Sequence, residues 1–178
     1  MLCRTSLRIK FAIFIGIFMV FVQAGSAEAS SDPKLIGTYG NWSAYEFKDD
    51  DGKKVCFMSS KPTSAKGNYK RRGDIYAYIT HWPSKGHRNM INIDTGYPYK
   101  KGSTVSLSID GSKFTLATEG EKAWAYDQPS DDKIAKAIQK GSRMIVKGTS
   151  TRGTLTTDTY SLKGTTKAYQ AISKACRL

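Results

Sequence analysis

Histidines, cysteines and long hydrophobic runs are scarce in this sequence, and their scarcity limits what the protein can do. The chain of 178 residues contains two histidines and three cysteines. A catalytic zinc site needs three protein ligands at ordered spacings, whereas His81 and His87 have no further ligand pattern around them. The sequence also lacks a G-x-S-x-G nucleophile motif, a P-loop and a dinucleotide-binding motif. We therefore predict no catalytic residue, no metal ligand and no cofactor.

One acidic stretch resembles part of a calcium site. Asp49-Asp50-Asp51-Gly52 offers several carboxylates in a row. It lacks the alternating ligand spacing and the distal Glu that an EF-hand loop requires. We interpret it instead as the acidic tip of a hairpin, because Asp and Gly are common turn residues.

The one long apolar run lies near the N-terminus and is shorter than a typical membrane span. Phe11–Val22 contains 12 consecutive apolar residues, whereas a spanning helix needs about 20. Three basic residues precede the run and small residues follow it. This layout predicts a secretory signal peptide over residues 1–29, cleaved after Ala29 or after Ala27. An uncleaved membrane anchor is the alternative.

Cleavage after Ala29 would leave a basic, exported protein. It would remove three basic residues and one acidic residue, which lowers the formal net charge from +13 to +11. No transmembrane segment is expected in the remaining 149 residues, because none of their apolar runs could span a bilayer. We expect the protein in the periplasm or on the outer-membrane surface of a Gram-negative bacterium.

The cysteines predict one disulfide bond. Cys3 would leave with the signal peptide, so Cys56 and Cys176 would remain in an oxidising compartment. A bond between them would close a loop of 120 residues. A redox or metal-binding role is the alternative, and it is disfavoured because neither cysteine has a neighbouring Cys or His.

Short segments of alternating polarity predict an all-β fold. In Val105–Leu116 the pair Asp110-Gly111 stands where a type I′ turn needs two residues with positive φ. Further strand segments are Leu35–Phe47, Lys54–Ser59, Ile75–His81, Met90–Asp94, Ala123–Tyr126, Arg143–Gly148 and Thr154–Leu162. About eight or nine strands with frequent turns favour a β-sandwich in one domain over residues 30–178.

Two segments have helical spacing instead. Ser130 can cap a helix in which Ile134 and Ile138 lie four residues apart, and Gly141 follows its predicted end. The segment Thr166–Cys176 places apolar residues on one helical face. We expect this C-terminal helix to pack on the sheet and to be held there by the disulfide bond.

Basic residues interleaved with aromatic ones form the candidate partner-binding set. Its members are Lys70, Arg71, Arg72, Gly73, Asp74, Lys85, Arg88, Lys100 and Lys101. For an exported protein, suitable partners are an acidic host-cell surface or the polyanions of the bacterial envelope, and nucleic acid is not expected. The alternative is that the excess of lysine only increases solubility.

The tripeptide Arg72-Gly73-Asp74 has a second interpretation. It is the sequence that integrins bind on exposed loops, and it stands just before a predicted strand. The alternative is an ordinary glycine turn with charged residues on either side. A choice between them requires the surroundings of both charged side chains.

Four segments of the chain belong together as a pattern. They are Leu35-Ile36-Gly37 through Trp42, Arg72–Ala77, Gly96–Tyr99 and, most specifically, Lys140–Leu162. This pattern resembles the invasion-associated locus B family of alphaproteobacteria over nearly all of the mature chain. Two positions depart from it, since Asn41 replaces a frequent Asp and no Cys follows Trp42. The family's disulfide pattern is therefore not simply inherited.

The resemblance implies a fold and a role. It implies an exported, immunoglobulin-like β-sandwich that takes part in the entry of intracellular bacteria into host cells, erythrocytes in the founding case. The family supplies no catalytic residues, so we predict a non-enzymatic virulence protein that promotes host-cell attachment or invasion. The alternative is a periplasmic module that maintains the envelope or binds a ligand there without host contact. The sequence predicts neither the receptor nor the oligomeric state.

Overall fold

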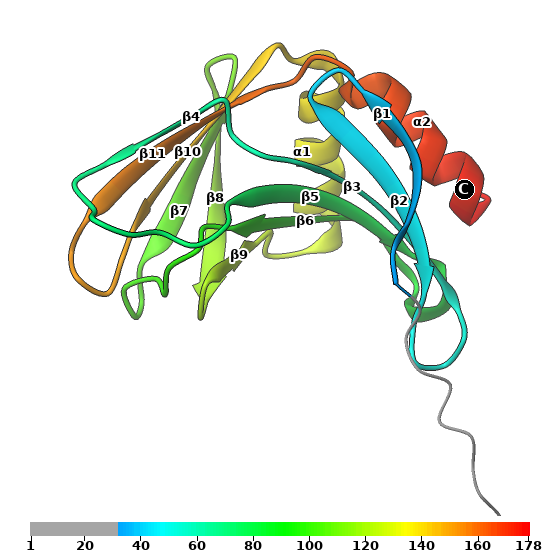
Figure 1. The fold of residues 1–178 in the computed structure, drawn as a ribbon, viewed down its shortest axis with the longest axis horizontal. Coiled ribbons are helices and arrows are strands. Elements are labelled where there is room, and N and C mark those ends of the chain that lie inside the picture. Colours follow the sequence, from blue (N-terminus) through cyan, green and yellow to red (C-terminus); the bar gives the residue numbers. More distant parts are fainter. Residues whose placement is uncertain (1–31) are drawn as a thin grey trace, which may run out of the picture.

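The computed structural model describes residues 32–178 and consists mainly of β-strands (Figure 1). Its strands are β1 (Lys34–Tyr39), β2 (Trp42–Lys48), β3 (Lys54–Ser60), β4 (Ser64–Gly67), β5 (Tyr76–Trp82), β6 (His87–Asp94), β7 (Thr104–Ile109), β8 (Ser112–Glu119), β9 (Lys122–Trp124), β10 (Arg143–Thr149) and β11 (Leu155–Ser161). Its helices are α1 (Gln128–Lys140), α2 (Thr165–Cys176) and the short 3₁₀ helix η1 (Pro83–Lys85). The predicted signal peptide lies outside the described residues. Within residues 32–178, no helix has the length and apolar character to cross a membrane.

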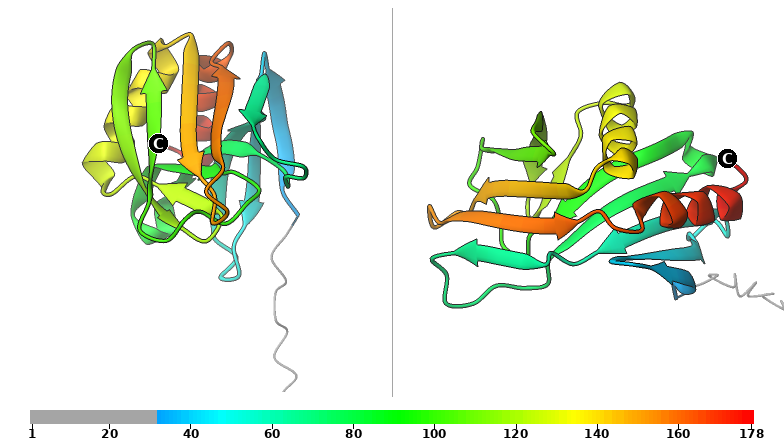
Figure 2. Two further views of the ribbon diagram at one scale, coloured as in Figure 1. Left: turned by 90° about the vertical axis from the view of Figure 1, so that its left-hand side faces the viewer. Right: turned by 90° about the horizontal axis from the view of Figure 1, so that it is seen from above.

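The strands form one antiparallel sheet in the order β1-β2-β3-β5-β6-β9-β8-β7-β10-β11-β4. Most neighbours are joined by hairpins, but β4 is displaced from its place in the sequence. The chain leaves β3, pairs β4 with β11 at the far edge, and returns to pair β5 with β3. Figures 1 and 2 show that the sheet bends strongly, so that β1–β6 without β4 form one half and the remaining strands form the other.

Alternating side chains explain how one sheet forms a core. In β5, Ala77, Ile79 and His81 are buried, whereas Tyr76 and Tyr78 lie half-buried on the opposite face. Such alternation is the period-two pattern of a strand with one buried face. The buried residues of both halves and both helices belong to one hydrophobic cluster. The all-β, sandwich-like fold is thus confirmed, and its two layers are halves of one hydrogen-bonded sheet.

The turns confirm several predictions from the sequence and correct one. Asp110 and Gly111 both have positive φ, 45° and 94°, at the β7–β8 turn. The carboxylate of Asp49 accepts hydrogen bonds from the backbone N–H groups of Asp51 and Lys53, which makes the acidic stretch a hairpin tip. The segment 35–47 was predicted as one strand and is two, because Gly40 turns the chain with a φ of 60°.

Both helices pack against the half of the sheet that contains β1–β6. Helix α2 contacts β1, β2, β3 and β5, and α1 contacts β6 and α2. The cap of α1 differs from the prediction, because Asp127 and not Ser130 is the N-cap residue. The Asp127 carboxylate accepts a hydrogen bond from the backbone N–H of Ser130 at 2.8 Å. Gly141 follows α1 as predicted. In α2, Ala168, Ile172 and Cys176 form the buried side.

The disulfide bond between Cys56 and Cys176 is confirmed. It joins β3 to the end of α2 with a Cα–Cα distance of 6.0 Å. Near the other end of α2, just before its first residue, the indole N–H of Trp42 donates a hydrogen bond to the carbonyl of Ser161 at 3.0 Å, and the Trp42 ring is completely buried. The C-terminal helix is therefore held on the sheet by a covalent bond and by a buried aromatic core.

Candidate functional site

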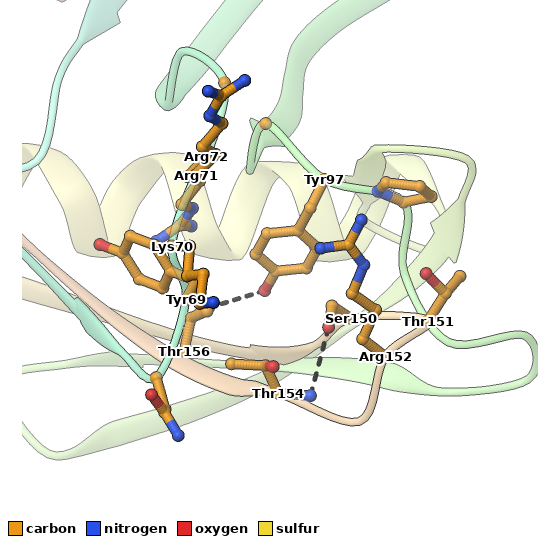
Figure 3. A pocket seen from close by; sticks show the side chains of 14 residues that line it. Tyr69, Lys70, Arg71, Arg72, Tyr97, Ser150, Thr151, Arg152, Thr154 and Thr156 are labelled. Atoms are coloured by element: carbon orange, nitrogen blue, oxygen red, sulfur yellow. Dashed lines mark hydrogen bonds between the residues drawn. The ribbon is translucent and has the colours of Figure 1, made fainter.

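A cavity of about 770 Å³ opens at the end of the molecule where the β10–β11 hairpin turns (Figure 3). Three segments that are far apart in the sequence surround it. The lining residues are Asn68, Tyr69, Lys70, Arg71, Arg72, Gly73, Gly96, Tyr97, Pro98, Ser150, Thr151, Arg152, Thr154 and Thr156. We call this set the basic pocket, because its cations face no lining carboxylate among the described residues.

Two glycines let the first two segments approach each other. The backbone N–H of Gly73 donates a hydrogen bond to the carbonyl of Gly96 at 2.9 Å. Gly96 has a φ of 65°, and a Cβ atom placed on it would lie 2.5 Å from the carbonyl of Gly73. Both the backbone angle and the close contact require glycine at position 96. These two residues therefore fix one wall of the basic pocket.

Arg72 forms the base of the basic pocket through a buried ion pair. Its two terminal nitrogens donate hydrogen bonds to both carboxylate oxygens of Asp158, at 2.7 and 2.5 Å. Its Nε donates to the carbonyl of Thr95 at 2.7 Å. The side chains of Arg72 and Asp158 are 4% and 0% exposed. Burial lowers the pKa of Arg72, but the hydrogen bond and the charge of Asp158 outweigh it, so the pKa is raised overall.

Two tyrosines flank the Arg72 guanidinium. Its central carbon lies 5.0 Å from the ring centre of Tyr97 and 5.4 Å from that of Tyr69. The Tyr97 hydroxyl forms a hydrogen bond of 2.6 Å with the Thr156 hydroxyl on β11. Burial raises the pKa of Tyr97, so its hydroxyl stays protonated at neutral pH. The guanidinium, the rings and β11 together give the basic pocket a fixed inner wall.

The predicted partner contact of Arg72 stays a prediction, and the structure gives this side chain an internal role as well. Its guanidinium is largely buried and donates hydrogen bonds to Asp158 and Thr95, so it is not an exposed surface cation. Asp74 is exposed and lies 3.1 Å from the ammonium group of Lys61. The tripeptide Arg72-Gly73-Asp74 therefore cannot present both of its charges on one surface. Its role in this fold is the glycine turn and the ion pair behind it.

Three exposed cations remain at the mouth of the basic pocket: Lys70, Arg71 and Arg152. None of them has an ion-pair partner within residues 32–178. Arg152 extends from the β10–β11 turn toward the segment that contains Tyr97 (Figure 3). Sequence reasoning selected Lys70 and Arg71 but missed Arg152, which stood only in a predicted turn. It also missed Asp158. The signal that could have identified this residue is a single acidic residue within a predicted strand rich in threonine, because such a carboxylate needs a basic partner if it is buried.

The other predicted partner-binding residues are divided between two ends of the molecule. The backbone N–H of Lys100 bonds to the carbonyl of Thr149, which places Lys100 and Lys101 beside the turn of the β10–β11 hairpin. Lys85 and Arg88 instead lie at the far end of β5 and β6, about 20 Å away by the length of these strands. There Lys85 lies 3.5 Å from Asp51, and the backbone of Arg88 bonds to the Gln128 side chain.

The outer surface of the half-sheet next to the basic pocket is also cationic. Register places Lys66, Thr157, Lys147 and Ser106 in one row across β4, β11, β10 and β7. The two lysines are two strand spacings apart, which is about 10 Å. Lys113 and Arg143 are exposed on the same face. We call Lys66, Lys113, Arg143 and Lys147 the basic face, and none of them has an ion pair among the described residues.

The histidines and acids of the described region do not converge on a metal site. Within residues 32–178, no three His, Cys, Asp or Glu side chains are grouped to hold an ion. His81 is buried behind α2, where its Nδ1 accepts a hydrogen bond from the backbone N–H of Asn89 and its Nε2 lies 3.1 Å from the Ser173 hydroxyl. Burial, followed by the nearby charge of Arg88, lowers its pKa to about 4. His81 is therefore a neutral core residue at pH 7.

Fold and site together define a small, mainly β protein with one internal disulfide bond. Its described surface carries a basic pocket and an adjoining basic face. The family model described as Invasion associated locus B (IalB) protein matches residues 42–173, which is most of the chain. The chain belongs to this family, and the resemblance seen in the sequence is confirmed. No curated protein and no solved structure matches the chain.

Proposed function

We propose that this protein is an exported, non-enzymatic virulence factor that promotes the attachment of an intracellular bacterium to host cells, erythrocytes among them, or their invasion. Membership of the invasion-associated family supports a role in virulence. The observation that carries the attachment role is the grouping of unpaired cations in the basic pocket and on the basic face. Cell surfaces carry anionic glycans and lipids, and a basic surface binds them in a salt-dependent way.

The proposal is tested by binding the purified protein to erythrocytes at increasing salt concentration. We expect binding to weaken with salt, because exposed charges are screened beyond about 8 Å at physiological ionic strength. The double substitution Lys66→Glu/Lys147→Glu should reduce binding strongly. A matched control, Lys136→Glu/Lys167→Glu, makes the same change in net charge at exposed positions on the helices. Equal loss in both variants would show that net charge alone, and not this surface, attracts the cells.

A bacterial strain without the gene provides the second test. We expect it to enter host cells less often, with entry restored by the intact gene but not by the Lys66→Glu/Lys147→Glu variant. Equal entry with and without the gene would contradict a role in invasion. The same strain tests the alternative, a periplasmic module without host contact, which predicts a growth or detergent-sensitivity defect in pure culture. That alternative is favoured by the predicted signal peptide, because such a peptide directs export only across the inner membrane.

A further inference from the structure

The composition of the basic pocket is unusual for a cavity of its size. Ligand-binding cavities of 300–1,000 Å³ are lined mostly by apolar side chains. None of the 14 lining residues, all within the described part of the chain, is Leu, Ile, Val, Met or Phe. The apolar part of its lining therefore consists of the Tyr69 and Tyr97 rings, Pro98 and the carbon atoms of polar side chains. Such a lining favours a ligand that combines polar groups with a flat face over an acyl chain.

The charge of the basic pocket indicates an anionic group on that ligand. Lys70, Arg71 and Arg152 are exposed, unpaired and positioned around the opening. Of the acids beside the lining residues, Asp158 is fully buried and paired with Arg72, and Asp74 is paired with Lys61. Asp94 accepts a hydrogen bond from the backbone N–H of Gly96. Guanidinium groups bind carboxylate, sulfate or phosphate oxygens through paired hydrogen bonds. Arg152 projects from a turn on one side of the cavity, and Lys70 and Arg71 belong to the segment on the opposite side (Figure 3), so an anion in the opening would have cations on both sides.

The remaining lining suits a ligand rich in hydroxyl groups. Ser150, Thr151 and Thr154 contribute side-chain hydroxyls from the β10–β11 hairpin, and Asn68 contributes an amide from the opposite segment. A hydroxyl group can donate and accept hydrogen bonds at once, as can the amide of Asn. The rings of Tyr69 and Tyr97 add flat, partly apolar surfaces on which the C–H face of a sugar ring can pack. Cations, hydroxyl groups and flat rings are the groups that recognise a charged saccharide.

The inner wall of the basic pocket is fixed before any ligand arrives. The Arg72–Asp158 ion pair, the Tyr97–Thr156 hydrogen bond and the Gly73–Gly96 contact join its three segments. A site held in this way loses less conformational entropy on binding than one built from free loops. This is the physical condition for selective binding of a small, strongly hydrated ligand.

From these observations we propose that the basic pocket binds a terminal acidic sugar, meaning a saccharide unit that carries a carboxylate, sulfate or phosphate group. The proposal rests on the proposed function for the source of this ligand, since host-cell glycans end in such units. It goes further by assigning recognition to Lys70, Arg71 and Arg152 rather than to the basic charge of the protein as a whole. The basic face would then supply general attraction, and the basic pocket would supply selectivity.

The test is a titration of the isotopically labelled, exported protein followed by nuclear magnetic resonance. Two matched pairs of probes are used: 3′-sialyllactose with lactose, and glucose 6-phosphate with glucose. We expect at least one acidic probe to shift the backbone signals of Gly73, Gly96 and Thr151, and to bind at least about tenfold more tightly than its neutral partner. That ratio corresponds to one lost charge-assisted hydrogen bond. Equal binding of acidic and neutral probes, or no binding by either acidic probe, would overturn the proposal.

Two variants locate the interaction. Arg152→Ala should weaken binding of the acidic probe about tenfold, whereas Arg143→Ala, at an exposed arginine on the same hairpin but on the basic face, should leave it unchanged. Both positions are exposed, so both variants are expected to fold, which their melting temperatures would verify. Equal loss in both variants would mean non-specific attraction and would refute the proposed site.

Inorganic phosphate and acetate, which carry no sugar, separate a sugar site from other anion sites. If either competes as well as the acidic sugar does, the proposal of a saccharide ligand is wrong. Because this titration contains no cells, its outcome is independent of the erythrocyte assay. A protein that attaches to cells through its basic face but ignores acidic sugars would sink this inference and leave the proposed function standing.

Discussion

Arg72 and Asp158 stand 86 residues apart in the sequence, yet they form a buried, bidentate ion pair that joins the β4–β5 connection to β11. This pair fixes the base of the basic pocket. It also removes Arg72 from the set of surface cations on which the predicted partner contacts depended. The consequences of this and other contacts can be measured directly.

Breaking the ion pair should destabilise the protein strongly. Arg72→Ala would leave the fully buried carboxylate of Asp158 without its partner. Removing one member of a buried pair typically costs about 3–5 kcal/mol. Urea unfolding of Arg72→Ala, Asp158→Ala and the double variant would give the coupling energy between the two residues. A loss below about 1 kcal/mol in both single variants, as for surface pairs, would contradict the buried pair.

Removing the disulfide bond should also lower stability. The Cys56→Ser/Cys176→Ser variant loses the bond that closes a segment of 120 residues, and losses of native disulfides typically cost 2–5 kcal/mol. The double substitution avoids leaving a free thiol. Its melting temperature should lie well below that of the oxidised protein and close to that of the reduced protein. Equal melting temperatures for the oxidised protein and the variant would contradict the prediction.

Trp42 provides a test of the core. Trp42→Ala should cost about 3–5 kcal/mol, because the completely buried ring leaves a cavity. Trp42→Phe keeps most of the ring but loses the hydrogen bond to the Ser161 carbonyl, and should cost much less. Unfolding in guanidinium chloride would give both values. A near-neutral Trp42→Ala would mean that the indole is not part of the packed core.

Gly96 and Gly86 form a matched pair for the wall of the basic pocket. Both have positive φ, but only a Cβ atom at Gly96 would collide with a backbone, that of Gly73. Gly86→Ala should cost about 1–2 kcal/mol for the backbone angle alone. Gly96→Ala should cost at least about 1 kcal/mol more, because overpacking adds to the angle. Similar losses of unfolding free energy in the two variants would show that the Gly73–Gly96 contact is not tight.

Two buried groups give opposing pH effects that variants can separate. Burial, and then the charge of Arg88, lowers the pKa of His81 to about 4 in the folded protein, against about 6.5 unfolded, so its contribution to stability falls as the pH drops from 6.5 to 4. Burial raises the pKa of Asp131 to about 6, helped by the charges of Asp132 and Asp127 and opposed by a hydrogen bond from the Ile91 N–H. Its contribution is complete below about pH 4 and is lost as the pH rises through 6.

The two effects therefore oppose each other between pH 4 and 6 in the native protein. Asp131→Asn should remove one of them and reveal a loss of stability on acidification. His81→Gln should reveal the opposite trend. Urea unfolding at pH 4, 5, 6 and 7 would measure both. Parallel pH profiles for the two variants would contradict these assignments.

Local patterns predicted the elements of this fold better than their long-range arrangement. The Asp110–Gly111 turn, the two helices and the Cys56–Cys176 pair followed from residue types and spacings. The pairing of β4 with β11 did not, because the four residues of β4, Ser-Ala-Lys-Gly, carry no alternating apolar pattern and their partners lie 89 to 95 residues away. The basic pocket depends on that pairing, so its residues could be selected from the sequence only one cluster at a time.

The roles of individual side chains in the basic pocket could not be predicted for the same reason. Arg72 stood in a run of basic residues beside a glycine, and this context is typical of an exposed loop. Its burial depends on Asp158, whose inward direction is decided by the alternation of β11 and by the register of that strand. Arg152 lies in a turn, as its sequence context predicted, but the local sequence does not show which segment faces that turn. Backbone hydrogen bonds between residues far apart in the sequence, from Thr151 to Pro98 and from Lys100 to Thr149, bring that turn next to Tyr97.

The spacing of the two disulfide cysteines has a consequence for how the protein matures. After removal of residues 1–29 as predicted, Cys56 and Cys176 are the only thiols in the chain, so no incorrect pairing within one molecule is possible. Cys56 nevertheless leaves the ribosome 120 residues before its partner, which at 5–20 residues per second is a delay of roughly ten seconds. During that interval it can react only with other molecules. Covalently linked dimers through Cys56 would therefore report directly on chains that oxidised before they had folded.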